Sequence, residues 1–209
     1  RLEADEPALA SMAFGTSDIF AAHYDCMRKG LRPEDIIETQ ASFGGQVRSW
    51  SSFRMNDDVT GGLKVFVTAR AEGPLTPSSV TGSPVTGLDH IVVNTVNPDR
   101  VMATFGARLG VRLALDRTNT KWGARFLFFR LPDTTIEVVQ RLDEEADPAR
   151  SDSLWGVTWE VEDLHPTRDR LVAAGLDVSE IREGRKHGTQ VMTVRNGTLN
   201  VPTLFLSKD

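Results

Sequence analysis

The feature that most constrains the fold is a unit of one strand, one helix and three further strands that recurs three times along the sequence. In the first unit a helix begins near Asp18 and ends at Gly30, and in the third unit a helix begins near Asp163 and ends at Gly175. Both helices have the same length, with a short polar side chain at the start and a glycine at the end, as helix termini commonly do. The agreement of helix length with strand order predicts three βαβββ modules.

These modules cover residues 8–70, 87–141 and 153–207. In each module a polar turn joins the third strand to an apolar last strand, which reads LKVFVT, TIEVVQ or VPTLFL. Alternate side chains of a strand point to opposite faces of the sheet. In the opening strand of the second module, LDHIVVNT, the alternation therefore puts His90 and Asn94 on the same face.

The bulk composition limits the class of protein. The chain of 209 residues has a net charge of −5 and a pI near 5.4, and its Lys and Arg residues are scattered, which argues against a nucleic-acid partner. No apolar run approaches the roughly 18–20 residues of a membrane-spanning helix, so no membrane partner is expected. The single cysteine, Cys26, excludes an internal disulfide and fits a reducing compartment. We therefore expect a cytoplasmic protein.

With its three βαβββ units, its LDHIVVNT opening strand and its TTIEVVQ closing strand, the chain resembles the vicinal oxygen chelate superfamily. That superfamily includes glyoxalase I, extradiol dioxygenases, methylmalonyl-CoA epimerase and bleomycin-resistance proteins. Within it, the chain is similar to glyoxalase-like domain proteins built from tandem modules. The resemblance implies an α+β fold in which repeated βαβββ modules pair into a curved mixed sheet, with the helices on the outer face.

The resemblance and the linker together predict two domains. Residues 71–87 are rich in Pro, Ser, Thr and Gly, which is typical of a linker. Residues 86–209 hold the second and third modules, which are expected to pair into one glyoxalase-like domain. Residues 1–78 hold a single module, half of such a domain, and open strand edges favour pairing with another chain. Its partner is expected upstream of Arg1, because the chain does not begin with Met, or in another subunit of a homodimer.

The resemblance also implies a metal site. In the metal-dependent members, the first and last strands of a module each give one ligand, and His90 and Glu137 stand at those positions. The resemblance therefore implies one divalent ion (Zn, Ni, Fe, Mn or Co) held by these nitrogen and oxygen donors. The matching positions of the third module hold Gly156 and Thr203, so only half of a four-ligand set is present. Two protein ligands seldom hold a metal tightly.

Three roles therefore stay open for the pair. His90 and Glu137 bind a catalytic metal, or they hydrogen-bond each other across the sheet as a remnant of a metal site. In the third alternative, Glu137 is an acid–base catalyst that works without metal.

Six further residues are predicted to bind a ligand on or near the concave face of the sheet: Asn94, Trp122, Arg125, Thr158, Glu160 and His187. Arg125 suits a carboxylate-bearing ligand through bidentate pairing, with a surface cation as the alternative. Trp155 and Trp159 lie in an apolar strand register and are expected in the core. The glycine pairs at 44–45 and 61–62 sit in turns rather than before helices, so they do not indicate a phosphate-cradling loop.

Two functions compete on this basis. The first is a lyase or isomerase, with dioxygenase as a further reaction type of the superfamily, that acts on a small oxygenated substrate in the concave cleft, with Glu137 as catalytic residue. The second is a metal-free protein of the bleomycin-resistance type that sequesters a small molecule. The retained pair of His90 and Glu137 favours the first function, and the missing ligands of the third module favour the second.

Overall fold

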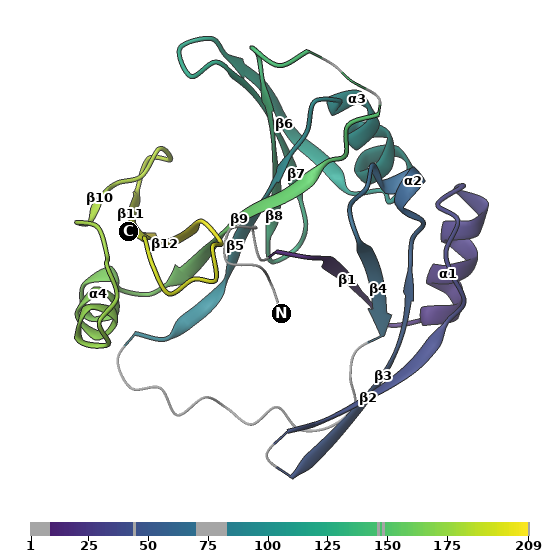
Figure 1. The fold of residues 1–209 in the computed structure, drawn as a ribbon, viewed down its shortest axis with the longest axis horizontal. Helices are drawn as coiled ribbons and strands as arrows, with labels where there is room; N and C mark the ends of the chain where they lie inside the picture. Colours follow the sequence, from purple (N-terminus) through teal and green to yellow (C-terminus); the bar gives the residue numbers. More distant parts are fainter. Residues whose placement is uncertain (1–8, 44, 70–82, 146, 148, 209) are drawn as a thin grey trace.

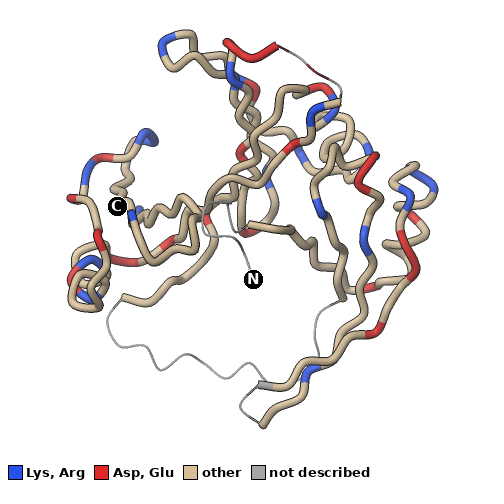
Figure 2. Tube along the Cα trace, viewed as in Figure 1, with Lys and Arg blue, Asp and Glu red and all other residues tan. Residues whose placement is uncertain are grey.

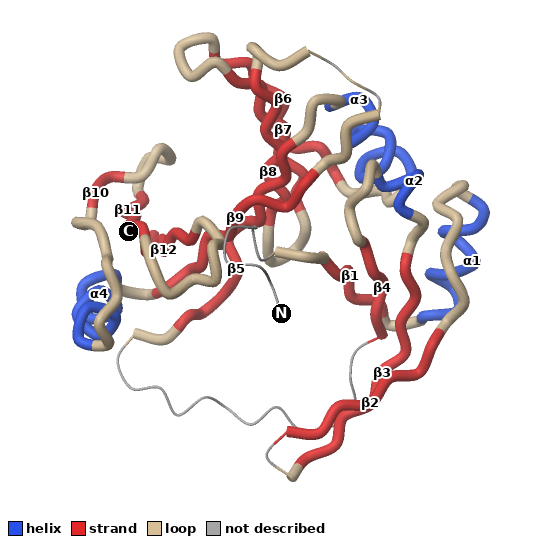
Figure 3. The backbone as a smooth tube through the Cα atoms, in the orientation of Figure 1, coloured by secondary structure: helices blue, strands red, loops and turns tan. Residues whose placement is uncertain are grey.

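The computed structural model describes residues 9–43, 45–69, 83–145, 147 and 149–208. In it the strands form one sheet of four strands and one curved sheet of eight strands (Figure 1). Some helices lie at the outside of the molecule, whereas helical segments of the first and second repeats contact each other between the sheets (Figure 3). The α+β class with curved mixed sheets, predicted from the sequence, is confirmed. None of the described helices is long and apolar enough to cross a membrane.

The four-stranded sheet comes from the first repeat. Its elements are β1 (Met12–Thr16), α1 (Ile19–Arg28), β2 (Ile37–Phe43), β3 (Gln46–Arg54), α2 (Asp57–Thr60) and β4 (Val65–Ala69). The strand order is β1-β4-β3-β2, and β1 runs parallel to β4. Helix α1 starts where the Asp18 carboxylate accepts a hydrogen bond from the backbone N–H of Ala21. The chain leaves the helix at Gly30, whose φ of 71° favours glycine.

The eight-stranded sheet combines the second and third repeats. The second repeat contains β5 (Val85–Asn94), α3 (Pro98–Val101), the π-helical η1 (Met102–Arg108), β6 (Arg112–Asn119), β7 (Ala124–Arg130) and β8 (Thr135–Arg141). The third repeat contains β9 (Ser153–Val161), α4 (Leu164–Ala173), β10 (Arg182–Glu183), β11 (Thr189–Val194) and β12 (Thr203–Lys208). The order is β10-β11-β12-β9-β5-β8-β7-β6, so the two first strands, β5 and β9, join the repeats at the centre. They pair antiparallel, whereas each pairs parallel with the last strand of its own repeat.

Three elements are shorter or less regular than the others. β10 has only two residues, and one isolated bridge joins Val178 to Val194 nearby. α3 is one α-helical turn that continues as the π-helix η1. α2 has four residues, which are too few to show a helical period in the sequence.

The main core joins the first two repeats on the helix side of their sheets. The ring of Phe105 in η1 lies 6.3 Å from the ring of Phe14 in β1 and 5.7 Å from that of Phe129 in β7. The Thr104 hydroxyl donates a hydrogen bond to the carbonyl of Val59 in α2. A second cluster, around Met192, fills the space under α4 in the third repeat. Because these cores occupy the helix side, the concave face of the large sheet is left for a ligand.

Candidate functional site

The eight-stranded sheet curves around a cleft of about 950 Å³. Strand alternation brings His90 and Asn94 of β5, Glu137 of β8 and Thr158 of β9 to its wall. The intervening side chains, such as Val93 and Val138, point into the core and are buried. Aromatic and aliphatic side chains from β6, β7 and β12 complete an apolar wall around these polar groups. Such a mixture of an apolar wall and few convergent polar groups is typical of small-molecule sites.

His90 is the centre of a polar cluster at the junction of the two repeats. Its Nδ1 lies 2.9 Å from Oδ2 of Asp89. Its Nε2 lies 2.9 Å from the hydroxyl oxygen of Thr158 and 3.3 Å from Oε2 of Glu137. Because Asp89 accepts a hydrogen bond from Nδ1, the ring presents Nε2 to the cleft, as an acceptor when it is neutral and as a donor when it is protonated.

A β-bulge puts Asp89 beside His90. In the pairing of β5 with β9, Leu88 lies opposite Trp159 and His90 lies opposite Thr158, so Asp89 is an extra residue with no partner. The bulge releases Asp89 from the strict alternation of the strand, and its carboxylate lines the cleft.

The two carboxylates of the cluster have opposite electrostatic environments. The hydrogen bond with His90 holds the pKa of Asp89 below its ordinary value, and the charges of His90 and Lys208 act in the same direction. Burial raises the pKa of Glu137, although the positive charges of His90 and Arg185 offset part of the effect. When the pKa values of two neighbouring carboxyl groups are moved apart, the group with the lower pKa stays ionised and the other can exchange a proton.

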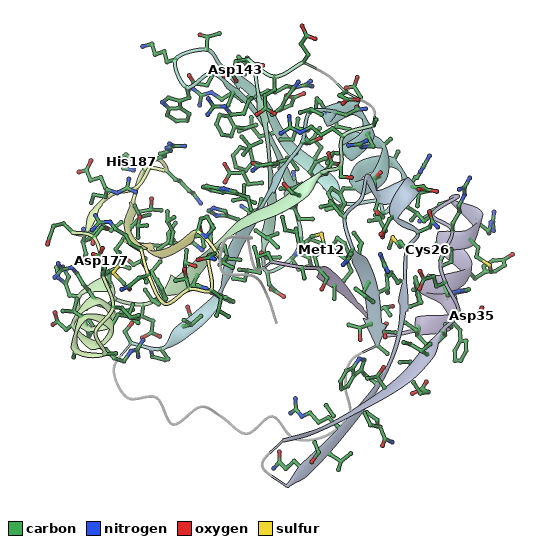
Figure 4. The ribbon with its side chains drawn as sticks, viewed as in Figure 1. Met12, Cys26, Asp35, Asp143, Asp177 and His187 are labelled. Atoms are coloured by element: carbon green, nitrogen blue, oxygen red, sulfur yellow. The ribbon has the colours of Figure 1, made fainter. Side chains whose placement is uncertain are left out.

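The other predicted residues divide into two groups. Asn94, Trp122 and Thr158 line the cleft. Glu160 does not line it, and its carboxylate pairs with the ammonium of Lys208 at the end of β12. His187 stands on the loop between β10 and β11 (Figure 4) and is likewise outside the lining.

Arg125 lies on the other face of the sheet. Its Nε and Nη2 are 2.9 Å and 2.7 Å from the two carboxylate oxygens of Asp116 in β6. Arg125 is absent from the cleft wall, so the bidentate pairing that its chemistry suggested is made with a neighbouring strand.

Two tryptophans predicted for the core have different environments. Trp159 packs against the second core cluster, as expected. Trp155 is 44% exposed and lines the cleft, so the prediction for it was wrong. Val92 pairs with Gly156 and Val93 with Leu154, which leaves Trp155 as the extra residue of a second bulge.

The sequence reasoning missed several residues of this site. Asp89 is the clearest case, because the only signal was its position next to His90 in an otherwise apolar strand. Arg185 and Lys186 line the cleft, whereas the prediction chose their neighbour His187 from the same loop.

The comparison with known proteins agrees with this architecture. A family model described as the Glyoxalase/Bleomycin resistance protein/Dioxygenase superfamily matches residues 89–193, about half of the chain. The chain belongs to this superfamily.

Two relatives illustrate the relationship. Ethylmalonyl-CoA/methylmalonyl-CoA epimerase of Cereibacter sphaeroides is 28% identical over an alignment of 115 residues, and the match covers 50% of this chain and 84% of that protein. The crystal structure of methylmalonyl-CoA epimerase from Mycobacterium tuberculosis superposes with a TM-score of 0.51 at 21% identity and covers 64% of this chain and 93% of that one. At this identity the second likeness shows the fold alone.

Within this superfamily member, the donor set does not fit a tightly held divalent ion. His90 and Glu137 contact each other, and the matching positions of the third repeat carry no metal-ligating side chain. A Cβ atom on Gly156 would lie 2.7 Å from the carbonyl oxygen of Pro202, so the backbone excludes a side chain there. The position matching Glu137 presents Leu204 to the cleft, whereas Thr203, expected there from the sequence, is buried away from it. Among the described residues, no cluster of three or more His, Cys, Asp or Glu is arranged to hold a metal.

Proposed function

We propose that the chain is an isomerase-type enzyme that moves a proton on a carbon next to a carbonyl group, with Glu137 as the proton-transferring residue. The observation that carries the proposal is a carboxylate, with only 17% of its side chain exposed, that lies in a cleft and contacts a histidine. A carboxyl group with a raised pKa can both accept and return a proton near neutral pH. The superfamily and the epimerase relative support this reaction class.

The chemistry divides between the residues of the cluster. Glu137 accepts the proton when the C–H bond breaks, and the electron pair of that bond passes into the carbonyl group as an enolate. Protonated Nε2 of His90 donates a hydrogen bond that favours this negative charge, and Asp89 holds the ring in place through Nδ1. Return of the proton re-forms the C–H bond, and isomerisation results when the enolate turns before Glu137 returns the proton, so that the proton arrives on the other face. The apolar wall limits access of water to the enolate.

The substrate that we propose for the first test is a 2-substituted malonyl thioester, since the epimerase relative carries such substrates in its name. Methylmalonyl-CoA and ethylmalonyl-CoA are incubated with the protein in heavy water, and deuterium at C2 is followed by NMR. We expect exchange by the wild type and a loss of at least about 100-fold in Glu137→Gln, in line with removal of a general base. Glu183→Gln, an exposed carboxylate on β10, is the control and should exchange normally.

Exchange that survives in Glu137→Gln, or no exchange with either thioester, would contradict the proposal. The second candidate function is sequestration of a small molecule. One observation favours it: Gly156 and Leu204 line their side of the cleft without offering a catalytic group. Tight binding of a thioester without exchange would support it. Metal analysis of the protein, purified without chelator, tests the donor set separately, and we expect less than one ion per chain.

A further inference from the structure

The cleft has a charge opposite to that of the whole chain. The chain has a net charge of −5. Six cationic side chains line the cleft against two carboxylates, Asp89 and Glu137, which leaves a formal excess of four positive charges. The six are Arg117, Arg130, Arg141, Arg182, Arg185 and Lys186. Clustered like charges repel each other and destabilise a fold, so a local excess of this size indicates an anionic ligand.

Most of this positive charge is not neutralised inside the protein. Among the described residues, no carboxylate lies within 4.0 Å of the charged groups of Arg117, Arg182, Arg185 or Lys186. Arg195, which does not line the cleft, has a carboxylate partner in Asp177. Four cations without a carboxylate partner among the described residues therefore share the wall of one cleft.

These cations come from opposite edges of the sheet and line the same cleft. Arg182 belongs to β10 and Arg185 to the loop that follows, whereas Arg117 belongs to β6. Basic residues mark the β10–β11 loop in the charge-coloured trace (Figure 2). The guanidinium carbon of Arg185 lies 4.3 Å from the centre of the Trp122 ring, so the loop and the hairpin touch across the mouth.

Arg185 also acts electrostatically on the reacting end of the cleft. Its positive charge lowers the pKa of Glu137 and thereby offsets part of the effect of burial. Arg185, Glu137 and His90 line the same cleft, so a ligand held near Arg185 can extend to Glu137 and His90. The cleft volume of about 950 Å³ is at the upper end of the range for small-molecule sites, and it exceeds the need of a small acid alone.

We infer that the mouth of the cleft is a binding site for a phosphate or diphosphate group, which belongs to the same ligand whose other end reacts at Glu137. This inference rests on the proposed function, because it gives that substrate a phosphorylated tail. The fork of an arginine pairs with two phosphate oxygens at once, which a scattered surface cation does not do. On binding, the guanidinium of Arg185 leaves the face of Trp122 and contacts the phosphate. Arg117 from β6, and Arg182 and Lys186 from the other edge of the sheet, add positive charge.

The test measures binding of inorganic pyrophosphate and tripolyphosphate to the full chain by titration calorimetry, with malonate as a dianion without phosphorus. We expect Arg185→Gln to weaken pyrophosphate binding about tenfold, the change for one charge-assisted contact. The double variant Arg182→Gln/Lys186→Gln should weaken it further, and added salt should weaken it in the wild type. Arg195→Gln is the matched control, because this arginine of the same repeat pairs with Asp177 and does not line the cleft.

Equal weakening in Arg195→Gln, no weakening in Arg185→Gln, or no pyrophosphate binding by the wild type would overturn the inference. If malonate binds as tightly as pyrophosphate, and depends equally on Arg185, the site recognises carboxylates and the inference of a phosphate site is wrong. The inference and the proposed function fail separately. If pyrophosphate binds in a way that depends on Arg185 but no deuterium exchange occurs, the phosphate site stands and the proposed reaction is wrong. If exchange occurs without such binding, the reaction stands and the phosphate site is wrong.

Discussion

At the scale of single residues, Glu137 is a carboxyl group whose ionisation works against the fold. Burial raises its pKa, so the folded chain holds the proton more tightly than the unfolded chain does. The free energy of unfolding is highest at pH values below the pKa that Glu137 has in the unfolded chain. It declines as the pH rises from there through the pKa of Glu137 in the folded chain, because ionisation is less favourable in the folded state.

Replacing Glu137 with glutamine should therefore stabilise the chain at high pH. We expect Glu137→Gln to melt higher than the wild type at pH 8, on the order of 2–4 °C if about 1 kcal/mol is regained. The difference should vanish below pH ~4, where an ordinary carboxyl group is protonated in both states. Calorimetric melting at both pH values checks this, with Glu183→Gln as the control. A lower melting temperature at pH 8 would mean that the contact of the charged carboxylate with His90 outweighs its desolvation.

The sequence was informative about those residues that obey strand alternation. His90 and Glu137 stood out as polar side chains in apolar strands, and both line the cleft. Asp89 and Trp155 could not be assigned in this way, because each is the extra residue of a bulge and escapes the period of two. The pairing of Arg125 with Asp116 also needed the structure, since it depends on the register of two neighbouring strands.

At the scale of elements, the close approach of β9 to the chain before β12 decides what the third repeat can contribute. Gly156 lies in β9 opposite Val92. A Cβ atom there would meet the Pro202 carbonyl oxygen at 2.7 Å and its Cβ at 3.2 Å. The contact is with backbone, which cannot rotate away as a flexible side chain can. The close approach of Pro202 to β9 therefore leaves no room for a side chain at position 156.

A substitution at Gly156 tests this close approach. We expect Gly156→Ala to lower the free energy of unfolding by about 1–3 kcal/mol, the usual range for overpacking. Gly87→Ala is the matched control, because Gly87 lies in the adjacent strand β5 and nothing is within 4 Å of a Cβ atom there. Denaturant unfolding of both variants measures the difference. Equal stability of the two variants would show that β9 can move away from Pro202.

At the scale of the whole molecule, the first repeat has the same strand order as the other two but lacks their pairing. In the second and third repeats, the first strands β5 and β9 pair edge to edge. In the first repeat, β1 is the edge of a four-stranded sheet, and among the described residues no strand pairs with its free side. Open edges of this kind are templates for another strand.

We expect a second copy of the chain to cover this edge, with the two β1 strands antiparallel about a twofold axis, as β5 and β9 are in one chain. The backbone N–H of Met12 donates to the carbonyl of Lys64, just before β4, so the N–H of Ala13 points to the free side. Ala13→Pro removes only this outward donor. Light scattering should give twice the mass of 23.0 kDa for the wild type and for Ala13→Ser, which keeps the N–H, and a single mass for Ala13→Pro. A wild type that remains monomeric at every concentration, or an Ala13→Pro variant that remains dimeric, would exclude pairing through β1.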